Sequence, residues 1–165
     1  MEDKMQIIKM YNATAHLYNM RYEDEQKLKI SFILNKIRPK EDEIILDIGC
    51  GTGILFKMTN CKNIIGIDIS INMLKEAKKG KKADLILADG EFLPIRSESV
   101  DIVISTTVLN LVKNKENFLN EAMRCLKKGG RFCISILKKE KPLILENTEI
   151  YESETMKDIF IFGKK

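Results

Sequence analysis

The chain has 165 residues, of which 44% are hydrophobic and 32% charged, and its net charge is +4. This length and composition predict one globular domain with a single hydrophobic core and exclude a largely disordered chain. No apolar stretch is long enough to span a membrane, and the N-terminal M-E-D-K-M lacks the apolar region of a signal peptide. We therefore expect a cytoplasmic protein with no membrane partner.

A metal centre is not expected. The four cysteines, Cys50, Cys61, Cys125 and Cys133, show no C-x-x-C spacing, and His16 is the only histidine. We interpret the cysteines as reduced and mostly buried thiols, and His16 as an ordinary surface or core histidine rather than a base.

The first part of the chain predicts helical structure. Residues Met5–His16 predict a helix or a partly ordered arm, and Glu23–Ile37 predict a helix with apolar residues on one face, which Pro39 ends. Residues 1–40 are therefore expected to form an N-terminal arm, and residues 41–165 the core of the domain.

A glycine-rich loop follows the first predicted strand. The stretch Glu43–Gly53 reads E-I-I-L-D-I-G-C-G-T-G. Its branched apolar residues predict a strand that is buried on both faces of a parallel sheet and interrupted near its end by Asp47. Gly49, Gly51 and Gly53 allow a sharp turn and the close approach of a ligand. The helix that is predicted to begin at Ile54 would point free N–H groups toward that ligand.

Acids end the next two predicted strands. The strand Ile64–Asp68 finishes on a carboxylate that can accept both hydroxyls of a ribose, and Ser70 caps the helix that follows. The strand Asp84–Ala88 is followed by Asp89, whose carboxylate can accept a hydrogen bond from an exocyclic amine such as that of adenine.

The remaining elements complete an alternation of strands and helices that ends in a hairpin. They are a strand at Val100–Ser105, a helix at Lys115–Leu126, a glycine turn at Lys127–Arg131, a strand at Phe132–Leu137, a helix remnant at Pro142–Leu145, and two paired strands at Thr148–Glu152 and Asp158–Phe162.

These motifs together resemble those of small, single-domain class I S-adenosylmethionine (SAM) dependent methyltransferases of type 11. D-I-G-C-G-T-G followed by G-I-D-I-S resembles their glycine loop and ribose acid. The segment Y-N-A-T-A-H-L-Y-N at 11–19 resembles their Y-D-x-x-A-x-x-Y-D lead-in, with asparagine in place of both aspartates. The resemblance implies one α/β domain over 1–165, with a Rossmann-like three-layer sandwich. Its mostly parallel seven-stranded sheet would have the order 3-2-1-4-5-7-6 and an antiparallel last strand.

The resemblance also implies a site for SAM as the cofactor. The glycine loop and Asp47 would hold the methionine part, and Asp68 the ribose. Ile69 and Met73 would flank the adenine, although Met73 is equally explained as a core residue. Tyr18 would either close the arm over the cofactor or pack the arm on the core. The candidate cofactor-binding residues are Tyr18, Asp47, Gly49, Cys50, Gly51, Thr52, Gly53, Asp68, Ile69, Met73, Asp89, Gly90, Glu91, Ser105 and Asn110.

Ser105 and Asn110 are expected near the reactive methyl group, at the end of the fourth strand. No catalytic residue is assigned, because transfer from a sulfonium needs alignment of the acceptor more than its activation. The acceptor stays open between RNA, a translation-related protein and a small molecule. The residues S-T-T-V after the fourth strand differ from the D/N/S-P-P-Y/F quartet of enzymes that methylate planar amines.

The sequence leaves two other functions open. A nicotinamide-binding domain would favour G-x-G-x-x-G, whereas position 54 here is isoleucine. A non-catalytic SAM-binding subunit would act through a partner protein. In the implied strand order, the strand at 84–88 is a sheet edge without charged residues in Leu85–Ala88. Several small methyltransferases bind a small zinc-containing activator protein at this edge, although an apolar third strand is also common where no activator binds.

Overall fold

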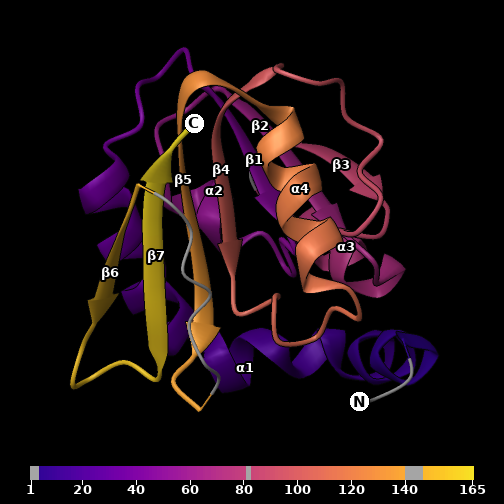
Figure 1. Ribbon diagram of the computed structural model, residues 1–165. Helices are drawn as coiled ribbons and strands as arrows, with labels where there is room; N and C mark the ends of the chain where they lie inside the picture. The colour runs from indigo at the N-terminus through magenta and orange to yellow at the C-terminus, as the bar shows by residue number, and fades with distance from the viewer. Residues whose placement is uncertain (1–3, 81–82, 140–146) are drawn as a thin grey trace.

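The computed structural model describes residues 4–80, 83–139 and 147–165. Within them, the strands form one seven-stranded sheet in the order β3-β2-β1-β4-β5-β7-β6 (Figure 1). Neighbouring strands pair in parallel except around β7, which is antiparallel to both β5 and β6. The predicted fold class, strand order and antiparallel last strand are therefore confirmed.

The helices and strands alternate along the chain as the sequence predicts. Their bounds are α1 Lys4–Ile37, β1 Ile44–Ile48, α2 Ile54–Met58, β2 Asn63–Asp68, α3 Ile71–Ala77, β3 Asp84–Leu87, β4 Val100–Thr106, α4 Lys115–Cys125, β5 Leu126–Leu137, β6 Thr148–Glu152 and β7 Asp158–Lys164. The predicted helix remnant at Pro142–Leu145 lies outside the described residues.

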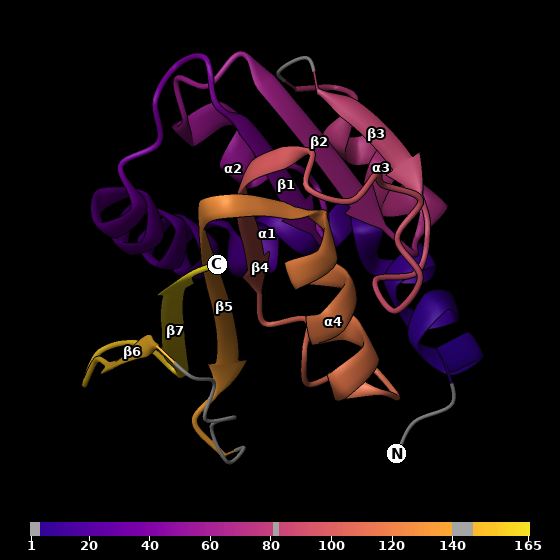
Figure 2. The same cartoon turned by 45° about the horizontal axis from the view of Figure 1, so that its top comes forward.

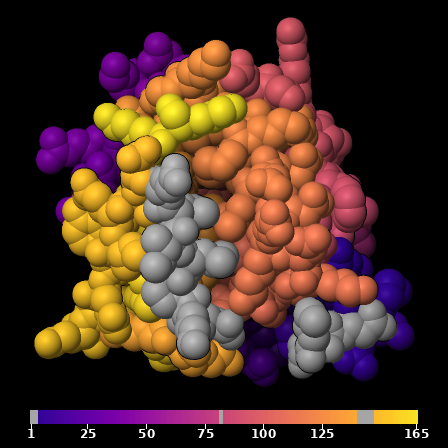
Figure 3. Space-filling model, in the orientation of Figure 1, coloured from indigo at the N-terminus to yellow at the C-terminus, as the bar shows by residue number. Residues whose placement is uncertain are grey.

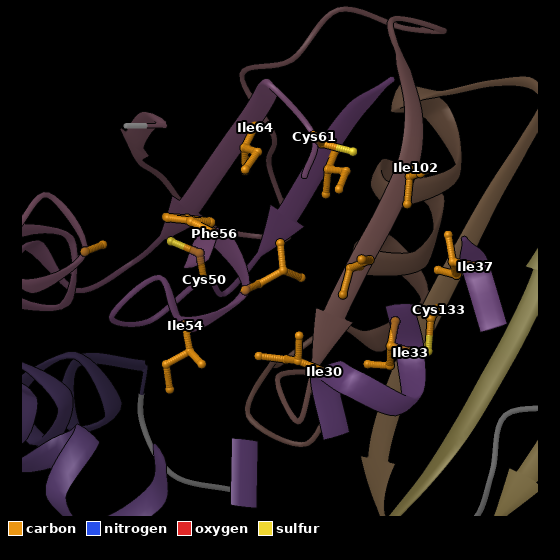
Figure 4. Packing of buried hydrophobic residues seen from close by; sticks show 14 of the residues in the cluster. Ile30, Ile33, Ile37, Cys50, Ile54, Phe56, Cys61, Ile64, Ile102 and Cys133 are labelled. Carbon is orange, nitrogen blue, oxygen red and sulfur yellow. The ribbon is translucent and has the colours of Figure 1, made fainter. Parts of the chain in front are cut away.

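Helices cover both faces of the sheet, which gives the three layers. On one face, α1, α2 and α3 bury a cluster that includes Ile33, Phe56 and Ile102, and Figure 4 shows side chains of these layers pointing toward one another. On the other face, α4 packs Phe118 and its neighbours against the sheet. Figure 2 shows α4 lying over that face, and its orange atoms are at the surface in Figure 3. The central strands bury side chains on both faces, and their sequences are therefore nearly continuous runs of apolar residues.

The arm differs from its prediction, because α1 is one continuous helix of 34 residues rather than two separate stretches. Residues 17–22 contain no glycine or proline, so nothing there interrupts the helical hydrogen bonds. Ile30, Ile33 and Ile37 anchor the second half of α1 in the core. The first half extends across the carboxyl ends of the strands (Figure 1).

The start of β5 was also predicted incorrectly. The glycine turn at 127–131 lies within β5, because Val100 pairs with Leu126 before the register shifts and Ile102 pairs with Arg131. The intervening residues form an irregularity in which Gly129 has a φ of 76°. The helix α2 ends at Met58, and Thr59 after it is extended. Among the described residues, no helix is long and apolar enough to cross a membrane.

Candidate cofactor site

A cavity of about 490 Å³ opens at the carboxyl ends of the central strands, beneath the first half of α1. This volume suits a small molecule rather than a protein segment. Its walls come from α1 and from the loops that follow β1, β2, β3 and β4. The predicted residues that line it are Tyr18, Gly49, Gly51, Asp68, Ile69, Met73, Asp89, Gly90 and Glu91.

The three loop glycines all adopt left-handed backbone conformations, with φ values of 76°, 51° and 73°. A Cβ at Gly49 would overlap Val108, and one at Gly53 would lie 2.6 Å from the ring of Phe56. A Cβ at Gly51 would meet no protein atom within 4 Å. Packing inside the protein therefore leaves no room for a side chain at Gly49 or Gly53, although Gly49 also borders the cavity. Gly51 leaves open a part of the cavity wall that a side chain would fill.

Asp68 fixes this loop and faces the cavity. One carboxylate oxygen accepts a hydrogen bond from the Gly51 amide at 2.8 Å, and the other accepts one from the Ser70 amide at 2.8 Å. Burial raises the pKa of Asp68, although these amides oppose that shift. Each carboxylate oxygen has two lone pairs, so both oxygens can accept a further hydrogen bond from a ligand hydroxyl.

Asp47 lines a second cavity of about 40 Å³ that adjoins the first, since both are bordered by Tyr18, Gly49 and Gly51. The predicted residues Cys50 and Thr52 also lie there. Burial, and then the charge of Asp68, raise the pKa of Asp47 to about 7. A cationic group bound beside this carboxylate would favour its ionised form.

Asp89 and Glu91 are held by α1. The ammonium of Lys4 donates a hydrogen bond to Asp89 and lies 3.0 Å from a carboxylate oxygen of Glu91. Desolvation acts to lower the pKa of Lys4, but the bonds to the two acids outweigh it and raise that pKa. Lys4 is therefore a cation that ties the start of α1 to the loop after β3.

Asparagines tie α1 down at two further points. Asn12 accepts a hydrogen bond from the hydroxyl of Ser70 at 2.7 Å, and Asn19 accepts one from the hydroxyl of Thr52. Both asparagines belong to the lead-in segment at 11–19.

Burial raises the pKa of Tyr18, whose ring lies 5.1 Å from that of Tyr22.

Three predicted residues lie outside the lining of both cavities: Gly53, Ser105 and Asn110. The hydroxyl of Ser105 donates to the carbonyl of Ile48, so it joins β4 to β1. The side-chain oxygen of Asn110 accepts from the amide of Leu137 and joins the loop after β4 to β5. The residues after β4 that line the main cavity include Thr106, Thr107 and Val108.

Sequence reasoning missed Lys4, Glu25, Lys29 and Thr107, which also line the cavity. The spacing of Glu25 and Lys29 is that of an i,i+4 ion pair, which normally marks an exposed helix face. The structure buries Lys29 instead, with 1% of its surface exposed. No pattern in the sequence distinguishes the two cases.

Comparison with known families identifies the chain. Residues 46–134 match the methyltransferase domain family, and this segment contains the glycine loop, Asp68 and Asp89. The chain belongs to this methyltransferase family. The family and the fold imply SAM as the cofactor, and the cavity, the open wall at Gly51 and the carboxylate of Asp68 fit that molecule.

Two relatives illustrate the similarity. An uncharacterized protein of Methanocaldococcus jannaschii is 33% identical over 134 residues, which cover 81% of this chain and 53% of the relative. The ubiquinone/menaquinone biosynthesis C-methyltransferase UbiE of Campylobacter jejuni is 32% identical over 165 residues, covering 86% of this chain and 68% of the relative. The chain spans 53 to 66% of the length of three Methanocaldococcus jannaschii relatives.

Solved structures share the fold at low identity. A SAM-dependent methyltransferase structure from Methanococcus maripaludis aligns with a TM-score of 0.79 and 16% identity, over 99% of this chain and 93% of its own. A methyltransferase in complex with the Haloferax volcanii Trm112 methyltransferase activator aligns with a TM-score of 0.67 and 22% identity, over 76% of this chain and 59% of its own.

Proposed function

We propose that this chain is a SAM-dependent methyltransferase. The observation that carries the proposal is the pairing of Asp68 with Gly51: the carboxylate is fixed by the amide of a glycine whose missing side chain leaves the cavity wall open. A carboxylate in that position suits the hydroxyls of a ribose.

Each part of the site has a separate binding task in this proposal. Asp68 receives the ribose hydroxyls, Ile69 and Met73 supply apolar surface for the adenine, and Asp47 favours the ammonium of the methionine part. SAM supplies an electrophilic methyl group on a sulfonium. The protein contributes alignment, because holding an acceptor atom at about 3 Å and in line accounts for much of the rate in such a reaction. The first half of α1 covers the cavity and limits its access to water.

Calorimetric titration with SAM and with NADH tests the proposal against the nicotinamide alternative. We expect SAM to bind and NADH not to bind. Asp68→Asn should weaken SAM binding roughly 100-fold, as expected from the loss of hydrogen bonds to a charged acceptor. Asp84→Asn, at an exposed position on β3, is the matched control. SAM affinity that Asp68→Asn leaves unchanged would remove Asp68 from the site.

The acceptor is proposed to be RNA, a translation-related protein or a small molecule. Incubating the purified protein with tritiated-methyl SAM and cell extract separates these classes, because the label would partition with RNA, with protein or with small molecules after fractionation. Label in none of these fractions, from a protein that binds SAM, would favour the alternative of a non-catalytic SAM-binding subunit.

We further propose that a small zinc-containing activator protein binds the edge of β3. Among the described residues, β3 pairs only with β2, and Leu87 is 54% exposed. Unpaired backbone groups at such an edge can extend a sheet into a partner. The Haloferax volcanii complex, in which a methyltransferase of similar fold accompanies an activator, supports this proposal.

Co-expression with small zinc proteins from the same organism tests this partner. We expect one of them to co-elute with the chain and to improve its SAM affinity. The Ala88 amide donates to the Asp68 carbonyl of β2, so the amides of Leu85 and Leu87 face the free edge. Leu87→Pro should therefore abolish that complex, because proline removes a backbone donor from this edge. A monodisperse monomer that binds SAM and methylates its acceptor unaided would exclude the activator.

A further inference from the structure

A network of charged side chains lies at the end of the cavity bordered by β4, β5 and β7, and its central pair is buried. At its centre is Lys29 of α1, which is 1% exposed, and beside it Asp158 of β7, which is 0% exposed. The Lys29 ammonium lies 2.8 Å from a carboxylate oxygen of Asp158, 2.8 Å from Glu25 and 3.3 Å from the hydroxyl of Thr107. Lys29, Glu25 and Thr107 all line the cavity.

Hydroxyl groups complete this network around Asp158. Thr107 and Ser135 each donate a hydrogen bond to the same carboxylate oxygen of Asp158, at 2.7 Å. The amide of Thr107 donates to the hydroxyl of Ser135 at 2.9 Å. Thr107 has a φ of 63°, a conformation that is uncommon for residues other than glycine and that these bonds hold in place. Four elements are thus joined directly beside the cavity.

Stability alone does not account for this arrangement. A buried ion pair contributes little more than apolar side chains of similar volume, because both charges lose their hydration. The charges in the network also balance: the two cations Lys29 and Lys157 face the two anions Glu25 and Asp158, with Lys157 at 3.1 Å from Glu25. The result is a wall of compensated charges in which Lys29 and Asp158 are fixed by burial, whereas the Lys157 side chain is 75% exposed.

The position of this wall follows from the strand order. Asp68 and Asp89 mark the adenosine end of the cavity, at the carboxyl ends of β2 and β3, and the glycine loop follows β1. A ligand that extends from Asp68 past the glycine loop reaches the end of β4, where Thr107 stands. In the proposed function, which this inference takes as its basis, that is the end at which the sulfonium lies.

We propose that the balance between the charges of Lys29 and Asp158 sets the discrimination between SAM and its demethylated product, S-adenosylhomocysteine. The two ligands differ at the sulfur, which is positively charged in SAM and neutral in the product. Loss of the Lys29 cation leaves excess negative charge at this end and favours SAM. Loss of the Asp158 anion leaves excess positive charge and favours the product.

Calorimetric titration of both ligands tests this proposal without any need to know the acceptor. The measured quantity is the ratio of the two dissociation constants in the wild type, Lys29→Met, Asp158→Asn and the double variant. We expect Lys29→Met to shift the ratio about tenfold toward SAM and Asp158→Asn about tenfold toward the product. At an effective dielectric constant of about 20, one unit charge about 12 Å from another changes a dissociation constant about tenfold. The double variant should return near the wild-type ratio.

Opposite shifts separate this role from a purely structural one, because local loosening would weaken both ligands together. Glu76→Gln, in the surface pair with Lys79, is the control and should leave the ratio unchanged. If Lys29→Met does not fold, Glu25→Gln takes its place. Glu25→Gln and Asp158→Asn each remove an anion, so each should shift the ratio toward the product. Unchanged ratios in folded variants, or shifts of Lys29→Met and Asp158→Asn in the same direction, would overturn the proposal. Failure of the wild type to bind either ligand would instead overturn the proposed function, and this inference with it.

Discussion

Replacement of Asp47 by asparagine should make the protein more stable and bind its cofactor less well. Asp47 is 5% exposed, and burial, followed by the charge of Asp68, raises its pKa from 3.8 to about 7. A difference of about three pKa units corresponds to roughly 4 kcal/mol against the ionised form. Asparagine has almost the same shape without the charge. We therefore expect Asp47→Asn to raise the free energy of unfolding at pH 8 by up to about 4 kcal/mol.

The pH dependence follows from the direction of the shift. The folded state binds the Asp47 proton more tightly than the unfolded state does. The contribution of Asp47 to the free energy of unfolding is therefore fully present below pH 3.8 and is lost as the pH rises toward 7. Urea unfolding of both proteins between pH 5 and 8 measures the effect. The stability advantage of Asp47→Asn should grow over this range and level off above pH 7. A variant that is less stable than the wild type at pH 8 would refute the reasoning.

Cofactor binding should show the opposite preference. An ammonium beside Asp47 would lower its pKa, so binding of SAM to the wild type should release a proton near neutral pH. The affinity of the wild type should then fall about tenfold between pH 8 and pH 6, while that of Asp47→Asn should be weaker and nearly constant. Calorimetry in two buffers of different ionisation enthalpy measures both the affinity and the released proton. Wild-type affinity that does not change with pH would separate Asp47 from the ammonium.

Three other changes test separate parts of the structure. Gly51→Val should abolish SAM binding measured by calorimetry, because the side chain would enter the cavity from a backbone with a φ of 51°; retained affinity would argue against the glycine loop. Deletion of residues 1–22 should leave a folded protein by circular dichroism, held by Ile30, Ile33 and Ile37, but should weaken SAM retention; an unfolded product would show that the arm is structural. Phe56→Ala should cost about 3–5 kcal/mol in urea unfolding because the ring is fully buried; a loss under 1 kcal/mol would mean that the core collapses around the gap.

Local sequence determined a large part of this protein. The strand, the glycine loop and the helix from Ile44 to Met58 follow from residues that are neighbours in the chain, and so does the capping of α3 by Ser70. The strand order came from the family resemblance of these motifs, and the structure bears it out. Asp68 could be found because its position at a strand end places it at the carboxyl edge of the sheet whatever the distant contacts are.

Tertiary structure alone decided the rest. Three equivalent glycines in the sequence separate into one that opens the cavity and two that serve packing, since only their neighbours Val108 and Phe56 distinguish them. The sequence predicts Lys29 as one half of a surface ion pair, whereas the structure buries it beside Thr107 and Asp158. These residues lie 78 and 129 positions away along the chain. Burial and charge balance depend on which distant segments meet, and the folding of the whole sheet brings those segments together.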